Sequence, residues 1–279
     1  MKARALLRRL PQLLLALAVA ALVVVGFSSV RPQSSPAGVL RISAGEVPPH
    51  MDWTGGGREA EIIRAALRDE HGPGGIEFHV APFSRHWEVF KRDERLHAAA
   101  TTPLNMQLKG FASQPYIRYR NGIIYRAGDF PDGLGPQPVA ALRDRRVVAF
   151  AGAALVLPGL QAAIPTFRSY AEYDDQYVHS VMLARGFVDV VIADRLIVDA
   201  YSRQVLGPRY EAEAARLRFD PAFCPTAYRM VFRTDALRAA FDKGLVAAGG
   251  RGELAAIEVR YDAAAGIPEV ARPLTGCAP

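Results

Sequence analysis

The apolar positions of the chain switch repeatedly between a spacing of two and a spacing of three to four residues, which predicts alternating strands and helices. Residues 39–43 alternate like a half-buried strand that stops at the breakers Gly45 and Pro48. Residues 58–69 place four apolar side chains on one helical face, and residues 76–80 have a strand pattern again. The first third of the chain therefore predicts a strand, a helix and a second strand.

A short strand of small residues is predicted at 96–100, and a helix is predicted directly after it. Thr102 suits an N-cap and Pro103 suits the first helical position, so Met106 is expected inside that helix. Residues 116–125 then alternate between apolar and polar side chains, as in another strand.

The second half of the chain repeats the alternation of strands and helices. The pattern predicts strands at 146–150, 168–170, 187–192 and 227–232, and helices at 153–163, 174–185 and 195–204. Thr234 is expected to cap a last helix that ends at Gly249 and Gly250. Alternation of this kind predicts an α/β fold with parallel sheets covered by helices.

The N-terminus has the pattern of an export signal. Lys2, Arg4, Arg8 and Arg9 precede an apolar run at 13–27, and a spacer rich in Pro and Ser follows. We expect a signal peptide at 1–28 and a spacer at 29–37. The apolar run of about 15 residues is short for a membrane span, which needs roughly 20, and an uncleaved membrane anchor is the alternative.

Composition and charge limit the remaining classes of function. The chain of 279 residues is 50% hydrophobic and 22% charged, which is typical of a globular protein large enough for two lobes. Four of its six net positive charges belong to the N-terminal segment, so nucleic-acid binding is not expected. The histidines lack metal-ligand spacing and there are two cysteines, so we expect no metal and no cofactor.

Cys224 and Cys277 are the two cysteines of the chain. An exported compartment permits a disulfide between them. The sequence alone does not show that they meet, and two unrelated thiols are the alternative.

Four segments of the chain follow one another in an order that is found in a known family. The first strand leads to Pro48 and Pro49, and a later segment joins Thr101 and Thr102 to the run Ser113-Gln114-Pro115-Tyr116. These segments resemble family 3 bacterial solute-binding proteins, also called type II periplasmic binding proteins. Residues 142–150 are similar to the strand that enters the second lobe in that family. Residues 183–194 are similar to its Leu-x-x-Gly-x-Val-Asp-Ala-x-x-x-Asp run. Together the four segments cover nearly all of residues 38–262.

The resemblance implies the two-lobed fold of the type II periplasmic binding proteins, an α/β fold in which each lobe is a mostly parallel sheet flanked by helices. Lobe one is expected at 38–122 and 223–270, lobe two at 123–222, and a tail at 271–279. Two crossing strands, near 116–125 and 226–232, are expected to join the lobes. The lobes of that family close on a small solute.

The same resemblance implies which residues contact the ligand. Amino-acid binders of the family hold the ligand carboxylate with an arginine, and counting back from Ser113 places Met106 at that position. Thr101 matches a hydroxyl that helps to bind the carboxylate, Ala153 replaces a polar residue of the second lobe, and Asp194 matches the aspartate that meets an ammonium group. We therefore expect a ligand other than a standard amino acid held by an arginine.

Each of these residues also has a structural interpretation. Met106 suits ordinary packing, Thr101 suits a hydroxyl satisfied by nearby backbone, and Asp194 suits the N-cap of the helix that follows it. Outside the motif, Glu46 and Trp53 lie in the loop after the first strand, where family members contact ligands; plain loop residues are the alternative. Arg85 could supply the missing cation, or be a surface arginine.

The resulting hypothesis is a small, partly apolar or cationic ligand held by Trp53, Met106 and Asp194. The expected protein is a monomeric solute-binding protein of the periplasm that serves an ABC-type inner-membrane permease. It is not expected to be an enzyme, because no acid, base and nucleophile converge in the sequence. The alternatives are a membrane-anchored ligand-sensing module and, with less support because the family's arginine is missing, an enzyme similar to cyclohexadienyl dehydratase.

Overall fold

The computed structural model describes residues 38–72, 74–274 and 277. The segments interpreted as signal peptide, 1–28, and spacer, 29–37, lie outside the described residues. Residues from Gly38 onward form one compact unit. None of the helices within the described residues combines the length and the apolar character that a membrane crossing requires.

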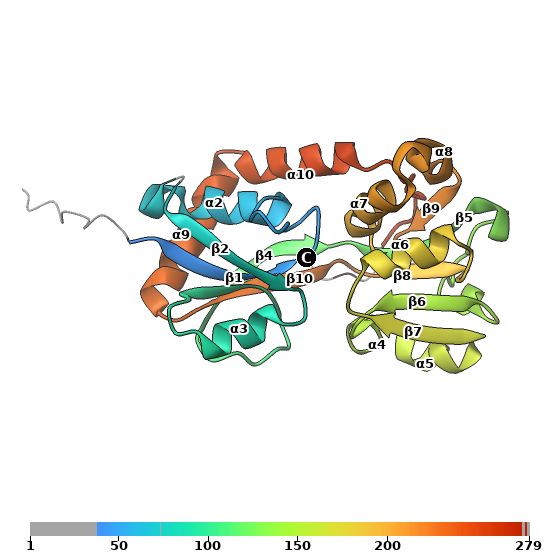
Figure 1. The fold of residues 1–279 in the computed structure, drawn as a ribbon, viewed down its shortest axis with the longest axis horizontal. Coiled ribbons are helices and arrows are strands. Elements are labelled where there is room, and N and C mark those ends of the chain that lie inside the picture. The colour runs from blue at the N-terminus through green and yellow to red at the C-terminus, as the bar shows by residue number, and fades with distance from the viewer. Residues whose placement is uncertain (1–37, 73, 275–276, 278–279) are drawn as a thin grey trace, which may run out of the picture. The chain divides into compact units, whose positions relative to one another are not determined.

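Lobe one is built on a five-stranded mixed sheet (Figure 1). β1 pairs in parallel with β2 and β3, whereas β10 pairs antiparallel with β3 and β4. Its strands, in the order β2-β1-β3-β10-β4, are β1 (Leu40–Glu46), β2 (Ile76–Pro82), β3 (Ala98–Pro103), β4 (Phe111–Tyr119) and β10 (Thr226–Phe232). One face carries α2 (Arg58–His71), α9 (Asp235–Gly250) and α10 (Glu253–Ala264), and the other carries α3 (His86–Arg92).

Lobe two has a second five-stranded mixed sheet. β6 pairs in parallel with β7 and β8, and β5 pairs antiparallel with β8 and β9. In the order β7-β6-β8-β5-β9, its strands are β5 (Asn121–Arg126), β6 (Arg146–Phe150), β7 (Ser169–Tyr173), β8 (Val190–Asp194) and β9 (Leu217–Asp220). The helices are α4 (Ala153–Val156), α5 (Leu160–Ala163), α6 (Tyr177–Ala184), α7 (Arg195–Leu206) and α8 (Tyr210–Ala214). Short 3₁₀ turns occupy Ala127–Asp129, Ala140–Leu142, Ile164–Thr166 and Gly207–Arg209.

Burial of apolar side chains holds each sheet between its helices. In lobe one, Ile42 and Phe232 of the sheet pack with Ile63 of α2 and Phe241 of α9. The second sheet is covered on both faces, by separate clusters around Leu160 of α5 and Val198 of α7. Ile197 and Tyr201 of α7 also join the core of lobe one, so α7 packs against both lobes.

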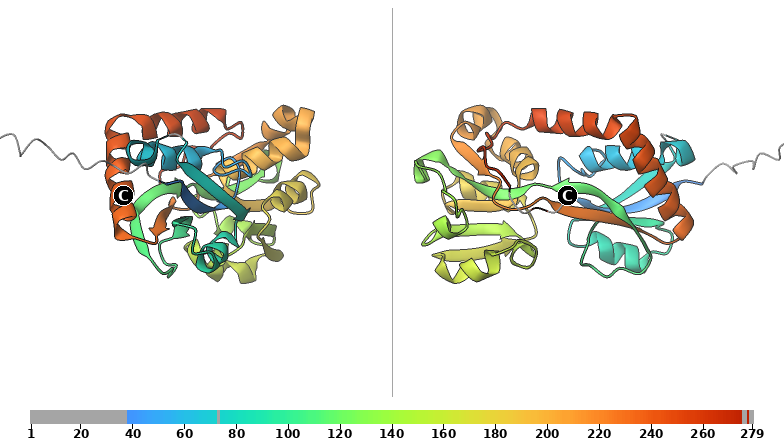
Figure 2. Two further views of the ribbon diagram at one scale, coloured as in Figure 1. Left: turned by 60° about the vertical axis from the view of Figure 1, so that its left-hand side comes forward. Right: turned by 180° about the vertical axis from the view of Figure 1, so that it is seen from behind.

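The chain passes between the lobes three times (Figure 2). The first passage is at Arg120, between β4 and β5, and the second leads from β9 to β10. The third follows α10, where the Phe219 amide donates to the Pro268 carbonyl and the Val270 amide donates to the Phe219 carbonyl. Ile267 to Arg272 therefore lie against β9 of lobe two.

A disulfide joins Cys224 and Cys277. The alternative of two unrelated thiols is therefore wrong. Arg272 adds an ion pair with the buried Asp220 of β9. Both contacts fix the C-terminal segment next to the second passage between the lobes.

The prediction of a helix after Thr102 is wrong. β3 continues through Pro103 because it pairs with β10, with Thr102 opposite Arg229, and a turn follows in which the Met106 amide donates to the Pro103 carbonyl. The Thr102 hydroxyl donates to the Ala100 carbonyl instead of capping a helix. Strand pairing on both edges of β3 outweighs the local helix-start signal.

The helix predicted at 153–163 is divided into α4 and α5. Pro158 and Gly159 interrupt it, and Gly159 has a left-handed φ of 78°. The crossing expected as one strand at 116–125 consists of β4 and β5, which belong to different sheets, and β10 lies wholly in the sheet of lobe one.

Candidate functional site

A cavity of about 540 Å³ lies between the two lobes. Residues of lobe one reach it from the loops that follow β1 and β2, and residues of lobe two reach it from the loop after β7 and from α7. Its walls are formed by Glu46, Val47, Pro48, Trp53, Pro82, Phe83, Asp174, Asp175, Gln176, Tyr177, Tyr201 and Gln204. Open α/β sheets bind ligands outside the carboxyl ends of their strands, which is the place of this cavity.

Two residues singled out in the sequence, Glu46 and Trp53, come together here. Glu46 ends β1 and is half-buried, and its carboxylate accepts a hydrogen bond from the Tyr201 hydroxyl at 3.3 Å. Burial raises the pKa of Glu46, and the nearby charges of Asp175 and Asp52 act in the same direction. The Trp53 side chain is 60% exposed at the wall of the cavity.

The cavity is acidic. Asp174 and Asp175 follow β7 and face it together with Glu46, and none of the three forms an ion pair within the described part of the chain. Asp174 accepts a hydrogen bond from the Ser84 hydroxyl of lobe one, and Asp175 accepts one from the Tyr177 amide at 3.0 Å. The wall includes no Lys or Arg among the described residues, so the carboxylates give it a negative potential.

Aromatic side chains supply much of the remaining wall. Trp53 and Phe83 come from lobe one, and Tyr177 and Tyr201 come from lobe two. The two tyrosine rings meet edge to face with their centroids 6.0 Å apart. Carboxylates beside aromatic faces are groups that bind organic cations.

Thr101 is fully buried away from this cavity. Its hydroxyl donates to the Glu59 carboxylate at 2.5 Å, and the Tyr116 hydroxyl donates to the same carboxylate oxygen. Burial raises the pKa of Glu59, against the effect of these hydrogen bonds. The partner of the Thr101 hydroxyl is thus a side chain of α2. The sequence had suggested a ligand or nearby backbone as its partner.

Ala153 is buried in the core of lobe two, beside a carboxylate supplied by the chain itself. Glu172 of β7 accepts hydrogen bonds from the Gly152 amide at 2.7 Å, the Ala154 amide at 2.9 Å and the Tyr170 hydroxyl at 2.6 Å. Burial opposes ionisation of Glu172, but these hydrogen bonds outweigh it and lower its pKa. The amides around Ala153 therefore already have an anionic partner.

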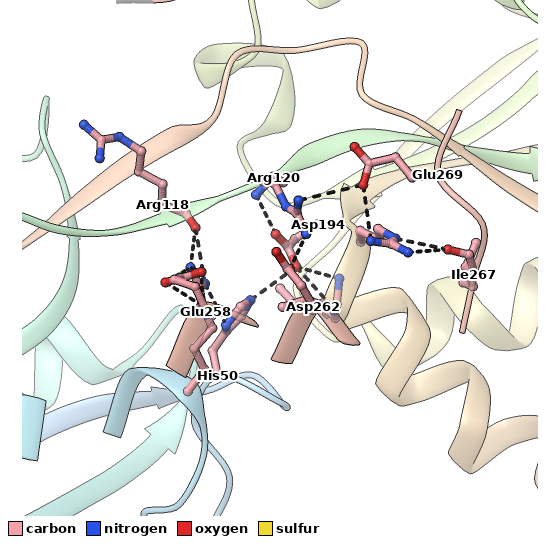
Figure 3. Close-up of polar contacts among 12 residues, drawn as sticks. His50, Arg118, Arg120, Asp194, Glu258, Asp262, Ile267 and Glu269 are labelled. Atoms are coloured by element: carbon pink, nitrogen blue, oxygen red, sulfur yellow. Dashed lines mark hydrogen bonds and ion pairs between the residues drawn. The ribbon is translucent and has the colours of Figure 1, made fainter. Parts of the chain in front are cut away.

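Asp194 caps α7, as its structural interpretation proposed. Its Oδ1 accepts from the amides of Leu196 and Ile197 and lies 3.2 Å from His50 Nε2, and its Oδ2 accepts from the Arg120 amide at 2.6 Å (Figure 3). Burial opposes ionisation of this carboxylate, but His50, Arg58 and the backbone amide of Ile197 lower its pKa overall. Asp194 is 2% exposed and does not line the inter-lobe cavity.

A second cavity, of about 510 Å³, lies next to Asp194 at the first passage between the lobes. Its wall contains two ion pairs, Arg58 with Glu258 and Arg120 with Asp262 (Figure 3). Of the other charged residues in the wall, Asp194 contacts His50, and Arg118 forms no ion pair among the described residues. Within the described part of the chain, this cavity therefore has one charged side chain without an ion pair, whereas the inter-lobe cavity has three.

Arg85 and Met106 are not among the residues that line the inter-lobe cavity. Arg85 is exposed at the start of α3, and Met106 is half-buried in the turn after β3, where its carbonyl accepts from Arg229 at 3.3 Å.

The sequence interpretation did not assign the lobe-two wall, which is formed by residues from Asp174 to Tyr177 and by Tyr201 and Gln204. The acidic and aromatic run directly after the predicted strand at 168–170 was the available signal, but Asp174 and Asp175 were interpreted as the start of a helix.

No family model matches the sequence, and no curated protein matches it significantly. Many solved structures are similar in fold, among them the following three. A histidine kinase sensor domain with similarity to periplasmic binding proteins is 17% identical, with a TM-score of 0.60 over 80% of this chain and 95% of that chain. An amino acid ABC transporter substrate-binding protein from Streptococcus pneumoniae, bound to L-arginine, is 18% identical, with a TM-score of 0.58 over 82% of this chain and 95% of that one. An ancestral amino acid-binding protein, described as a precursor of cyclohexadienyl dehydratase, is 13% identical, with a TM-score of 0.58 over 80% of this chain and 95% of that chain.

These similarities agree with the two mixed sheets and the repeated passage between them. The chain has the two-lobed fold of the type II periplasmic binding proteins.

Proposed function

We propose that the protein is a solute-binding protein that closes its two lobes on a small molecule in the inter-lobe cavity. The observation that carries this proposal is the composition of the cavity wall, to which both lobes contribute side chains. A ligand held between Trp53 and Tyr177 would contact both lobes at once. Closure on such a ligand excludes water and strengthens its polar contacts.

The ligand of this protein is not a standard amino acid held by an arginine. The cavity wall has no Lys or Arg among the described residues, and a buried carboxylate without a cationic partner is unfavourable. The acidic and aromatic wall supports the part of the sequence hypothesis that expected a cationic or partly apolar solute. Trp53 lines this wall and remains a proposed ligand contact. We propose Glu46, Tyr177 and Tyr201 as further ligand contacts, in place of Met106 and Asp194.

The role in the cell that fits this activity is delivery of the solute, by a periplasmic monomer, to an ABC-type permease of the inner membrane. The fold of the substrate-binding protein from Streptococcus pneumoniae supports this role. A membrane-anchored sensing module is the second candidate, supported by the fold of the histidine kinase sensor domain. The relation of the ancestral binding protein to a dehydratase keeps catalysis as a third candidate with less support.

A thermal-shift experiment on the purified full-length protein tests binding, with pools of small cationic, neutral and anionic metabolites. A ligand that binds the folded state at a hundred times its Kd stabilises that state by about 2.7 kcal/mol, which raises Tm measurably. The proposal requires a shift with at least one pool, and a smaller shift at the same ligand concentration when Trp53→Ala removes part of the cavity wall. A protein that shifts with no pool would not be a solute-binding protein of this kind.

Fractionation of cells that express the full-length chain separates the two cellular roles. A soluble, shortened chain in the periplasm supports delivery to a permease. A full-length chain in the membrane fraction supports the sensing module.

A further inference from the structure

We infer that the solute is a small organic cation with at least one N–H on its charged nitrogen, an alkyl or arylalkyl ammonium, and that Glu46, Asp175 and Gln176 recognise that group. This inference rests on the proposed function and specifies the chemistry of the same cavity.

The first argument is charge. Glu46 comes from lobe one and Asp174 and Asp175 come from lobe two, so negative side chains face the cavity from both sides. None of the three forms an ion pair with a described Lys, Arg or His. Carboxylates that share one cavity repel each other, and a bound cation removes that repulsion.

The second argument is a hydrogen-bond acceptor without a donor. Gln176 lines the same cavity and is only 9% exposed. Its side-chain oxygen is buried and has no hydrogen-bond partner among the described residues. A buried amide oxygen without a donor costs free energy. Solvent does not reach this oxygen in the present arrangement of the lobes, so the Gln176 amide must turn toward the cavity as the lobes close, where an ammonium N–H would supply the donor. A quaternary ammonium has no N–H to give, so Gln176 distinguishes the two kinds of cation.

The third argument concerns the rest of the ligand. Trp53, Phe83, Tyr177 and Tyr201 present aromatic surface to the cavity, which suits the apolar part of an amine and adds cation–π attraction. A volume of about 540 Å³ is within the range that small-molecule sites occupy. The ligand body is therefore an alkyl chain or an aryl ring.

The fourth argument is against a carboxylate on the ligand. Glu59 engages the hydroxyl of Thr101, and Glu172 engages the amides on both sides of Ala153. Those donors, at positions where the resemblance places carboxylate-binding groups, are occupied by carboxylates of the chain itself. The groups that remain at the cavity wall are mainly the carboxylates of Glu46, Asp174 and Asp175. An amine without a carboxylate suits these groups better than a zwitterion does.

Calorimetry on the full-length protein tests the inference with matched probes. The cationic probes are phenethylamine, 1,5-diaminopentane and phenethyltrimethylammonium; the neutral probes are phenethyl alcohol and 1,5-pentanediol; the anionic probe is 3-phenylpropionate. We expect binding of the primary amines, weaker binding of the trimethylated amine, and binding of neither the neutral nor the anionic probes.

Variants then assign the contacts. Glu46→Gln and Asp175→Asn are expected to raise the Kd of the primary amines by about tenfold to a hundredfold, since each removes a hydrogen bond to a charged group. Glu94→Gln and Asp132→Asn make the same charge changes at exposed residues away from the cavity and should leave Kd unchanged. Gln176→Leu should weaken the primary amines more than phenethyltrimethylammonium. Circular dichroism and Tm establish that each variant folds.

The outcomes separate this inference from the proposed function. If a neutral or anionic probe, or a member of the neutral or anionic metabolite pools, binds and Trp53→Ala weakens it, the cation inference is wrong and solute binding stands. If amines bind but Glu46→Gln, Asp175→Asn and Gln176→Leu leave their Kd unchanged, the assigned contacts are wrong. If no probe and no metabolite pool binds, the proposed function itself fails.

Discussion

Individual carboxylates decide what this chain can bind, because most of them already have partners. Glu172 and Asp194 accept hydrogen bonds at both carboxylate oxygens, and one oxygen of Glu59 accepts from Thr101 and Tyr116. Glu46 and Asp175 face a cavity and have no cationic partner among the described residues. A carboxylate with several donors stabilises the fold, whereas one without a cation is available to a ligand.

Glu172→Ala tests the structural role of a carboxylate that has donors. The substitution leaves the amides of Gly152 and Ala154 and the Tyr170 hydroxyl without their acceptor. We expect the free energy of unfolding to fall by about 1–3 kcal/mol, measured by urea denaturation. Glu211→Ala is the control, because the Glu211 side chain is 82% exposed, and it should change stability by less than about 0.5 kcal/mol. Equal effects of the two substitutions would contradict this role.

His179 of α6 makes stability depend on pH. It is fully buried, and neither ring nitrogen has a hydrogen-bond partner among the described residues. Burial lowers its pKa from 6.5 to about 4, against the smaller opposing effect of the backbone at Tyr173 and Ala149. The unfolded chain therefore binds a proton between these pH values that the folded chain does not, so stability is full above about pH 6.5 and falls as pH decreases toward 4.

His179→Leu should remove that part of the pH dependence, which amounts to at most about 3 kcal/mol. His86, whose pKa burial also lowers to about 4, keeps its own contribution, so the variant should retain part of the slope. Urea denaturation at several pH values between 4 and 7 measures it. An unchanged slope in the variant would mean that His179 accepts a proton in the folded state as readily as in the unfolded state.

At the scale of elements, α7 joins the lobes through its first residues. The Asp194 carboxylate caps the helix and also accepts from the Arg120 amide at the first passage between the lobes. His50 of lobe one contacts the same carboxylate. One side chain thus fixes the start of α7 relative to both lobes.

Asp194→Ala is expected to lower the free energy of unfolding by about 2–4 kcal/mol, because it removes a cap and leaves buried donors unpaired. Thr234→Ala removes the cap of α9, where the Thr234 hydroxyl accepts from Leu237, and should cost about 1 kcal/mol. Asp194→Asn should lie between wild type and Asp194→Ala, since its oxygen can still accept from the helix amides. Chemical denaturation measures the free energy of unfolding of each variant. If Thr234→Ala lowers it as much as Asp194→Ala does, Asp194 acts only as a cap.

The C-terminal segment is a second connecting element. The disulfide joins residues 53 apart in the sequence and holds this segment beside the second passage between the lobes. Replacing both Cys224 and Cys277 with serine should lower the free energy of unfolding by about 4 kcal/mol in the chain-entropy account. Reduction of the wild-type protein should have the same effect, and an equal stability of the oxidised and reduced protein would argue against it.

Strands and helices with a strong local pattern were predictable from the sequence. The predicted strand at 146–150 matches β6, and the expected helix at 58–69 falls within α2. The prediction of a helix at Thr102 failed because Thr102 and Pro103 pair with β10, whose residues lie more than 120 positions away and are not contained in a local pattern. α10 was missed because its apolar residues do not gather on one face, and only Ile257 of the helix is buried.

The whole molecule explains why the site was only partly predictable. Glu46 at the end of β1 and Trp53 in the loop after it lie where the resemblance led us to expect contacts, and both line the cavity. Tyr177 and Tyr201 complete that cavity from the other lobe, and only the folding of two lobes against each other brings them close to Glu46. Matching the sequence motifs identified the positions that correspond to ligand contacts in a related fold. It could not show that the hydrogen-bond donors at those positions already donate to Glu59 and Glu172.

Closure of the lobes gives a signal that reports on the whole molecule. The chain has two tryptophans, Trp53 at the cavity and Trp87 on α3. Trp53 is 60% exposed, so a ligand that brings the lobes together should bury its indole and shift the fluorescence emission to shorter wavelength.

Trp53→Ala should abolish that shift, because Trp87 is half-buried against Phe83 and His86 within lobe one and does not line the cavity. The variant should also raise the Kd of the amine probe by about twofold to thirtyfold, the range that corresponds to one lost cation–π contact. Its stability should change by less than about 0.5 kcal/mol, since the side chain is mostly solvated. An emission shift that survives in Trp53→Ala would mean that Trp87, which contacts Phe83 of the cavity wall, also reports on binding. A shift that is lost while Kd is unchanged would mean that the indole reports on closure without touching the ligand.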